Sequence, residues 1–148
     1  MDLTEPAQKA EKRETLSDSL ARLPRIDIAF HVPARGSADD EALSVLGTVL
    51  TGGRSARMYE SLVRQKALTT GVSAGTNGRR GPQLFMFSAT ASPGKSIGDL
   101  ESAIYAEIDR LKKEPIQPWE LDKARANAKR GSVAGMGSSL SLAMQLAE

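Results

Sequence analysis

Six residues near the middle of the chain have the types and spacing needed to hold a peptide. Two adjacent glycines are followed by a short run that carries two arginines, reading Gly-Gly-Arg-Ser-Ala-Arg. Glycines let a ligand backbone approach closely, free amides at a helix start can hold a carboxylate or carbonyl, and arginine adds a planar donor fork. The substrate-binding candidates are Gly52, Gly53, Arg54, Ser55 and Arg57. The same residues also have a structural interpretation as a helix C-cap, a turn and a helix N-cap, and both interpretations stay open.

Metal chemistry is limited by the presence of one histidine, His31, and no cysteine among the 148 residues. A catalytic zinc needs about three ligands drawn from His, Cys, Asp and Glu, with an open position for water. We interpret His31 as an ordinary strand residue, because it lies in an alternating stretch that supplies no second imidazole. The pair Asp39-Asp40 is explained by helix capping. We therefore predict no catalytic residue, no cofactor and no metal ligand in this chain.

Composition excludes several classes of protein. The chain has 20 basic and 18 acidic residues, which leave a net charge of +2, too small to require a polyanionic partner. A basic segment with Lys123, Arg125, Lys129 and Arg130 is better explained as a solvated face or a surface for a partner domain. No apolar run is long enough to span a bilayer. We predict a soluble globular domain without a nucleic-acid partner and without membrane insertion.

Hydrophobic periodicity and capping signals predict the elements that position the candidate residues. Strict alternation of apolar and polar residues indicates strands, Ser-x-x-Asp boxes indicate helix starts, and an Asn-Gly pair indicates a hairpin turn. Residues 1–11 are polar and are expected to form a flexible N-terminal segment. The predicted strands cover residues 12–18, 25–32, 68–76 and 83–91. The predicted helices run from Ser37 to the paired glycines, from near Ser55 to residue 66 or 67, from Ser96 to Pro115, and from Pro118 onward.

This order of elements, β-β-α-α-β-β-α-α, predicts an α+β fold in which helices pack on one face of an antiparallel sheet. After Gly137 a new apolar pattern begins at Leu140 and Met144, and the sequence stops inside it at Glu148. Such patterns usually continue to a capping residue. We therefore expect residues 12–148 to be one domain that is truncated at its C-terminal end, within a longer polypeptide.

The central run TGGRSARMYESLVRQKALTTGVSA resembles the glycine-rich turn, helix and strand of the C-terminal, non-zinc domain of insulinase-type (M16) zinc peptidases. The strand RIDIAFHVPA and the segment PIQPWELDKARANAKRG fit the same resemblance. The resemblance implies the same α+β architecture and a domain without hydrolytic activity of its own. It implies a zinc-bearing domain or subunit as partner, a peptide as substrate, and a role in closing a chamber around that peptide. A homo-oligomer and either bacterial compartment, cytoplasm or periplasm, stay open.

One departure from the family pattern concerns substrate holding. Active members typically read L-R-E-E-K-G-L-A-Y-S-V in this region, and the arginine and tyrosine hold the substrate backbone. Aligned on SLVRQKALTTGV, that pattern places Val63 at the arginine and Thr70 at the tyrosine, while Arg64 is one position away. One residue turns an α-helical side chain by about 100°. The alternative to a peptide-holding domain is therefore a catalytically inactive structural or assembly module of the same fold.

Overall fold

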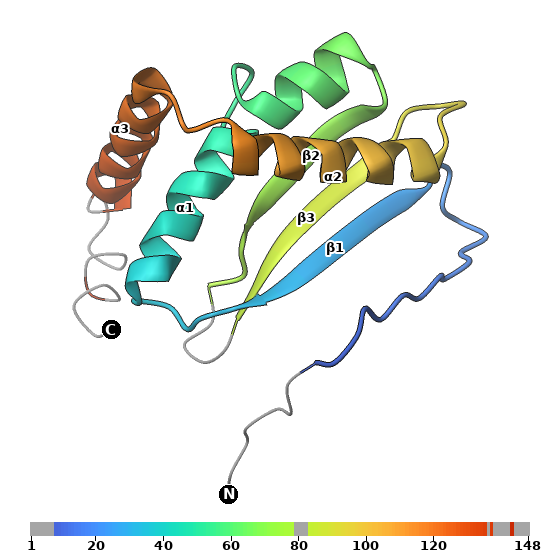
Figure 1. The fold of residues 1–148 in the computed structure, drawn as a ribbon, viewed down its shortest axis with the longest axis horizontal. Helices are drawn as coiled ribbons and strands as arrows, with labels where there is room; N and C mark the ends of the chain where they lie inside the picture. Colours follow the sequence, from blue (N-terminus) through green and yellow to red (C-terminus); the bar gives the residue numbers. More distant parts are fainter. Residues whose placement is uncertain (1–7, 79–82, 136, 138–142, 144–148) are drawn as a thin grey trace, which may run out of the picture.

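The structure is a computed structural model, and it describes residues 8–78, 83–135, 137 and 143. Its elements follow the order strand, two helices, two strands and two helices, and the strands form one sheet (Figure 1). They are β1 (Arg25–Val32), α1 (Ala38–Thr51), the π-helix η1 (Tyr59–Gln65), β2 (Thr69–Thr76), β3 (Gln83–Ala91), α2 (Ile97–Lys113) and α3 (Pro118–Gly135). The predicted α+β class is confirmed.

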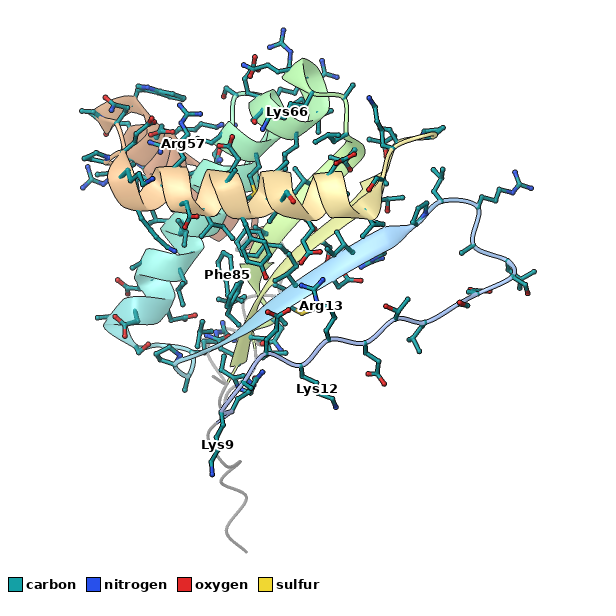
Figure 2. The ribbon with its side chains drawn as sticks, turned by 45° about the vertical axis from the view of Figure 1, so that its right-hand side comes forward. Lys9, Lys12, Arg13, Arg57, Lys66 and Phe85 are labelled. Atoms are coloured by element: carbon teal, nitrogen blue, oxygen red, sulfur yellow. The ribbon has the colours of Figure 1, made fainter. Side chains whose placement is uncertain are left out.

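The sheet has three antiparallel strands in the order β1-β3-β2, so the last strand in the sequence lies in the middle. Alternate residues of β3 are buried against the helices, which cover one face of the sheet (Figure 1). Phe85 and Phe87 pack edge to face at 5.2 Å on that side, and Leu100 and Ile104 of α2 are fully buried over them. Figure 2 shows Phe85 in this core. The core therefore lies between the sheet and its single helical layer.

The serine bond of both predicted capping boxes forms, and a carboxylate bond back to the helix start is present at Asp40, to Gly36 and not to Ser37. Ser37 accepts a hydrogen bond from the amide of Asp40, and the Asp40 carboxylate accepts one from the amide of Gly36 at 3.0 Å. Ser96 accepts from the amide of Asp99 in the same way at the start of α2. These bonds satisfy amides that have no partner within the helix. The predicted β2–β3 hairpin is confirmed as well, with Gly78 at a φ of +66° beside the turn.

One predicted element is wrong. Residues 12–18 are exposed and extended but form no strand ladder, because Leu16 is the only large apolar residue there and finds no neighbour to bury against. Arg13 instead fixes this segment to α2 through a two-point ion pair with Glu101 (Figure 2). The helix expected from near Ser55 to residue 66 or 67 is confirmed: it covers residues 57–65, and it has π geometry over Tyr59–Gln65. Met58 and Leu62 are both fully buried, as expected for residues four positions apart on the inward face of this helix.

α2 begins and ends close to its predicted positions, and α3 begins at Pro118 as predicted. α3 lies beside α1 at the edge of the fold (Figure 1). It continues through Gly131 to Gly135, although a glycine inside a helix costs about 1 kcal/mol relative to alanine. The apolar pattern at Leu140 and Met144 lies outside the described residues. Among the helices of the described residues, none has the length and apolar content needed to cross a bilayer.

Candidate functional site

The paired glycines are both required by the turn between α1 and η1. The amide of Gly52 donates to the carbonyl of Thr48 at 2.8 Å and ends α1, and a Cβ at this position would lie 2.4 Å from that oxygen. Gly53 has a φ of +94°, a conformation that other residues rarely adopt. The amide of Ala56 donates back to the carbonyl of Gly53. The turn is thus a compact structural unit whose glycines are explained by geometry alone.

Arg57 is committed to an internal ion pair. Its guanidinium donates to both carboxylate oxygens of Glu120 on α3, with N to O distances of 2.7 and 2.6 Å. It also donates to the backbone carbonyls of Glu114 and Pro115, at 3.3 and 3.1 Å. The side chains of Arg57 and Glu120 are only 10% and 5% exposed. The donors of Arg57 are therefore occupied by α3 and by the α2–α3 connection, and Figure 2 shows Arg57 beside α2.

Arg57 and Glu120 each shift the pKa of the other. The hydrogen bonds from Arg57 lower the pKa of Glu120, and burial opposes them only partly. The amide of Gln117 also donates to Glu120 at 2.8 Å, which lowers the same pKa further. The bond to Glu120 raises the pKa of Arg57. A carboxylate that accepts three hydrogen bonds, from a guanidinium and a helix-start amide, keeps its negative charge well into the acid range.

The remaining candidates of the turn lie at the surface. Gly53, Arg54 and Ser55 are all exposed. The hydroxyl of Ser55 accepts a hydrogen bond from the ammonium of Lys123 on α3 at 2.8 Å. Ser55 does not cap a helix, since the position before η1 is Met58 and no side chain caps it. Of the five candidates, Gly53, Arg54 and Ser55 are therefore exposed, Gly52 is half-buried at the end of α1, and Arg57 belongs to a buried ion pair.

The positions that carry arginine and tyrosine in the family pattern offer no comparable donors. Val63 is half-buried in η1, and Thr70 is exposed near the start of β2. Arg64 lies beside Val63 but pairs with Glu60 at 2.9 Å on the surface. The η1–β2 connection is also constrained, because Ala67 has a φ of +49°. Val63 therefore presents an apolar side chain where the pattern has a guanidinium. Thr70 presents a hydroxyl where the pattern has a phenol.

Sequence reasoning missed a second surface, the face of the sheet that no helix of the described residues covers. We name it the open face. Its members follow from the strand register and the alternation of side chains. They are Arg25, Asp27, Ala29 and His31 of β1, Leu84, Met86, Ser88 and Thr90 of β3, and Gly71, Ser73 and Gly75 of β2. In the sequence, this face is indicated by the polar residues that alternate with apolar ones along β1, namely Arg25, Asp27 and His31.

Charge on the open face is concentrated at one end. Arg25 donates two hydrogen bonds to Asp27, both at 2.9 Å, and the hydroxyl of Ser88 donates to Asp27 as well. The bonds from Arg25 lower the pKa of Asp27 despite partial burial. Further along the face the residues are small or apolar, with Ala29, Met86 and Gly75 adjacent across the strands, and His31 lies beyond them opposite Leu84. The open face therefore combines the hydrogen-bonded cluster of Arg25, Asp27 and Ser88 with a region of small and apolar side chains.

The residues present do not fit a zinc site. Across residues 8–78 and 83–135, no three side chains of His, Cys, Asp or Glu come together as a metal-binding group. His31 is exposed on the open face, and its strand partner is Leu84. One imidazole without further ligands cannot define a tetrahedral zinc site. We derive no metal-dependent step for this chain.

Comparisons with known proteins agree on one family. The sequence model described as the peptidase M16 inactive domain matches residues 2–128. The zinc protease PqqE of Helicobacter pylori is 27% identical over 141 residues, which is 95% of this chain and 32% of that protein. This chain therefore spans about a third of the length of that curated relative.

Solved structures give the same result. A protease from Helicobacter pylori matches with a TM-score of 0.80 and 28% identity, over 88% of this chain and 32% of that one. The inactive peptidase domain from Bordetella parapertussis matches with a TM-score of 0.75 and 28% identity, over 83% of this chain and 67% of that one. The fold of this chain matches these structures over most of its length, and the chain belongs to the peptidase M16 inactive-domain family.

Proposed function

We propose that this domain forms one wall of a peptidase chamber and helps to hold an extended peptide. In this proposal the zinc that cleaves the peptide is held by another domain or subunit. The observation that carries the proposal is the open face of the sheet. Family membership supports it, because relatives of this chain include proteins described as zinc proteases.

The open face has the shape that an extended peptide requires. Gly71 and Gly75 lie on β2 with Ser73 between them, and a methyl group added at either glycine would meet no atom within 4 Å. An extended peptide can therefore approach the strands without steric conflict. The fixed group of Arg25, Asp27 and Ser88 offers polar contacts at one end. A wall of this kind guides a peptide without cutting it.

The exposed part of the glycine turn is a further candidate for substrate contact. Gly53, Arg54 and Ser55 lie at the surface, and the guanidinium of Arg54 could pair with a peptide carboxylate. We leave Arg57 out of this role because Glu120 already occupies its donor fork. An Arg54→Ala variant of the parent protein is expected to raise KM for peptides with acidic residues. An unchanged KM would remove the turn from the proposal.

The experiment that tests the function is a peptidase assay on a mixed peptide library, with the full-length parent protein and with a chelator as control. Chelator-sensitive cleavage is expected. Filling the open face with Ser73→Trp or Gly75→Trp should lower kcat/KM about tenfold, which corresponds to about 1.4 kcal/mol. Ser102→Trp on the exposed side of α2 is the matched control and should leave the rate unchanged. If all three variants have the same kcat/KM as the native protein, the open face does not contact the substrate.

A structural or assembly module is the second candidate function. The observation in its favour is the replacement of the family's arginine and tyrosine by Val63 and Thr70, which offer no charged or phenolic donor. Buried or charge-assisted bonds of that kind contribute roughly 1 to 3 kcal/mol each. If the parent protein forms a stable complex or chamber but cleaves no peptide in the library, this second function is the correct one.

A further inference from the structure

Asn77 and Gly78 follow directly after β2 in the β2–β3 hairpin, and both are exposed. The last pair of the ladder is Thr76 with Phe85, so Asn77 lies opposite Leu84. The amide of Asn77 donates to the carbonyl of Leu84 at 3.1 Å, and the amide of Leu84 donates to the side-chain Oδ1 of Asn77 at 3.2 Å. The side chain of Asn77 is therefore held in place by the strand that faces it.

The amide nitrogen of Gly78 is available to attack the side chain that precedes it. Within the described part of the chain, this amide donates to no acceptor. Gly78 has a φ of +66°, and the space beside its Cα is open, because a Cβ added there would meet no atom within 4 Å. Attack on Cγ of an asparagine by the next amide nitrogen closes a five-membered ring, and the two groups are already neighbours in the chain. Asparagine is for this reason one of the thermolabile residues.

The hydrogen bond from Leu84 assists this attack. When the nitrogen adds to Cγ of Asn77, negative charge develops on Oδ1. A backbone amide that points at such an oxygen stabilises the transition state, as the donors of an oxyanion hole do. The Leu84 amide already donates to Oδ1 in the folded chain. The hairpin thus brings together a free nitrogen, a carbonyl group to be attacked and a donor for the developing charge.

The reaction needs only water as co-reactant and changes no oxidation state. The Gly78 nitrogen loses its proton to hydroxide and forms a bond to Cγ of Asn77. The bond between Cγ and Nδ2 then breaks, and Nδ2 takes a proton from water and leaves as ammonia. Water opens the resulting cyclic imide at one of its two carbonyls. Opening at the former side-chain carbonyl gives aspartate, and opening at the main-chain carbonyl gives isoaspartate.

The isoaspartyl product fits the hydrogen bonding of the hairpin. Its main chain runs through Cβ and Cγ, so the oxygen that was Oδ1 of Asn77 becomes a peptide carbonyl oxygen. That oxygen already accepts from the amide of Leu84, as a main-chain carbonyl does in an antiparallel pair. The former main-chain carbonyl carbon becomes a free carboxylate. A neutral amide is replaced by one negative charge, so the formal net charge of the chain falls from +2 to +1.

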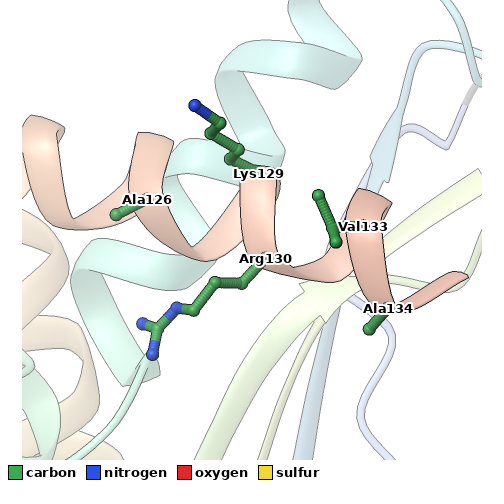
Figure 3. Close-up of a pocket in the computed structure, with 5 residues that line it drawn as sticks. All are labelled: Ala126, Lys129, Arg130, Val133 and Ala134. Carbon is green, nitrogen blue, oxygen red and sulfur yellow. The ribbon is translucent and has the colours of Figure 1, made fainter. Parts of the chain in front are cut away.

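The chain contains one other asparagine, Asn127, which provides an internal control. Its side-chain oxygen also accepts a hydrogen bond, from the guanidinium of Arg130. Asn127 lies inside α3, and Figure 3 shows that stretch of the helix, with Ala126 before it and Lys129 after it. The next amide, that of Ala128, belongs to the helix, where amides donate to the carbonyl four residues earlier. Asn127 therefore has a bonded oxygen but no free nitrogen beside it.

We propose that Asn77 is a site of spontaneous modification, at which the Gly78 amide displaces ammonia and the hairpin retains the isoaspartyl product. The new carboxylate stands next to Arg79 and Arg80 in the sequence and changes the charge of this turn as the molecule ages. An isoaspartyl carboxylate is a substrate for methyl transfer from S-adenosylmethionine, so a methyltransferase of that class is the enzyme that would act on the product.

Mass spectrometry of tryptic peptides follows the two asparagines in the folded chain near neutral pH. Residues 67–79 contain Asn77, residues 126–129 contain Asn127, and a synthetic peptide of residues 70–80 is the unfolded reference. A sample digested at once corrects for conversion during digestion. We expect Asn77 of the folded chain to convert to the acid within about tenfold of the rate of the reference, or faster, while Asn127 keeps its amide. A rate further below the reference would show that the hairpin protects Asn77, and conversion of Asn127 at an equal rate would show that the free nitrogen is irrelevant. Either result would overturn the proposal.

Variants identify the attacking nitrogen. Gly78→Ala places a methyl group beside it and should slow conversion about tenfold or more in the chain and in the reference peptide alike. Asn77→Gln requires a six-membered ring and should give no conversion. Thr76→Ser, next to the site but outside the ring, is the matched control and should convert at the native rate. Circular dichroism and the urea midpoint check that each variant is folded. Conversion of Asn77→Gln at the native rate would contradict attack by Gly78.

The modified chain differs from the native chain by one charge, so ion exchange separates the two. Hydrogen exchange at the Leu84 amide should remain slow in the modified chain, because its acceptor oxygen is retained. Incubation with an isoaspartyl methyltransferase and labelled S-adenosylmethionine should label the modified chain and leave the native chain unlabelled. Fast exchange at Leu84, or a modified chain that takes no label, would show that the hairpin does not retain isoaspartate.

Discussion

Arg57 and Glu120 connect the segment just before η1 to α3 through a two-point ion pair that is almost entirely buried. Both carboxylate oxygens accept from the guanidinium, at 2.7 and 2.6 Å. The same guanidinium holds the carbonyls of Glu114 and Pro115, so one side chain fixes the whole α2–α3 connection. An arginine that the sequence offers as a substrate ligand is thus a cross-link of the helical layer.

Removal of one partner of this pair should be costly. Arg57→Met keeps most of the side-chain volume but leaves the Glu120 carboxylate buried without its charge partner. We expect the free energy of unfolding to fall by about 3 to 5 kcal/mol, measured by urea denaturation. The matched control is Arg64→Met, which breaks an exposed pair with Glu60 and should cost about 1 kcal/mol or less. Similar losses for the two variants would contradict the cross-link.

The pH dependence of stability should identify Glu120. Its pKa is lowered in the folded state from an ordinary value of 4.5, chiefly by the bonds from Arg57. A carboxylate with a lowered pKa stabilises the fold fully above its unfolded value, and the contribution is lost as pH falls through the folded value. The difference in unfolding free energy between the native chain and Glu120→Gln should therefore be constant near pH 7 and shrink below about pH 4.5. A difference that stays constant down to pH 3 would show that the Glu120 charge does not stabilise the fold.

The sequence predicts those features that depend on local signals. The boxes at Ser37 and Ser96 position two helices correctly, because a capping hydrogen bond involves residues only three apart. The expected strand at residues 12–18 fails because alternation alone does not provide a neighbouring surface to bury Leu16. The role of Arg57 was equally out of reach, since its partner lies 63 positions away. Hydrophobic periodicity predicts where helices and strands form. The role of a charged residue such as Arg57 depends on a partner that is distant in the sequence.

The turn residues should differ in their tolerance of alanine. Gly52→Ala places a Cβ 2.4 Å from the carbonyl oxygen of Thr48, a backbone atom that cannot move without unwinding the end of α1. We expect a loss of about 2 to 3 kcal/mol. Gly53→Ala meets no atom within 4 Å but must adopt a φ of +94°, for roughly 1 to 2 kcal/mol. Gly71→Ala on the open face, as control, should change stability by about 0.5 kcal/mol or less. Thermal unfolding of the three variants checks this order, and a reversed order of Gly52 and Gly71 would refute the steric argument.

The outer edge of β2 is closed by a side chain of α1. The hydroxyl of Thr51 accepts a hydrogen bond from the amide of Ala74 at 3.1 Å, and Gly47 lets α1 approach so closely that a Cβ there would lie 3.0 Å from the Ala74 carbonyl oxygen. Thr51→Val keeps the shape and removes the acceptor, so the Ala74 amide loses its partner beside a packed helix. We expect a loss of about 1 to 3 kcal/mol and faster hydrogen exchange at Ala74. Thr48→Val, whose hydroxyl bonds only within α1 to Ser44, should leave both quantities nearly unchanged. If exchange at Ala74 is as slow in Thr51→Val as in the native chain, the edge is protected by packing of α1 alone, and the hydroxyl is dispensable.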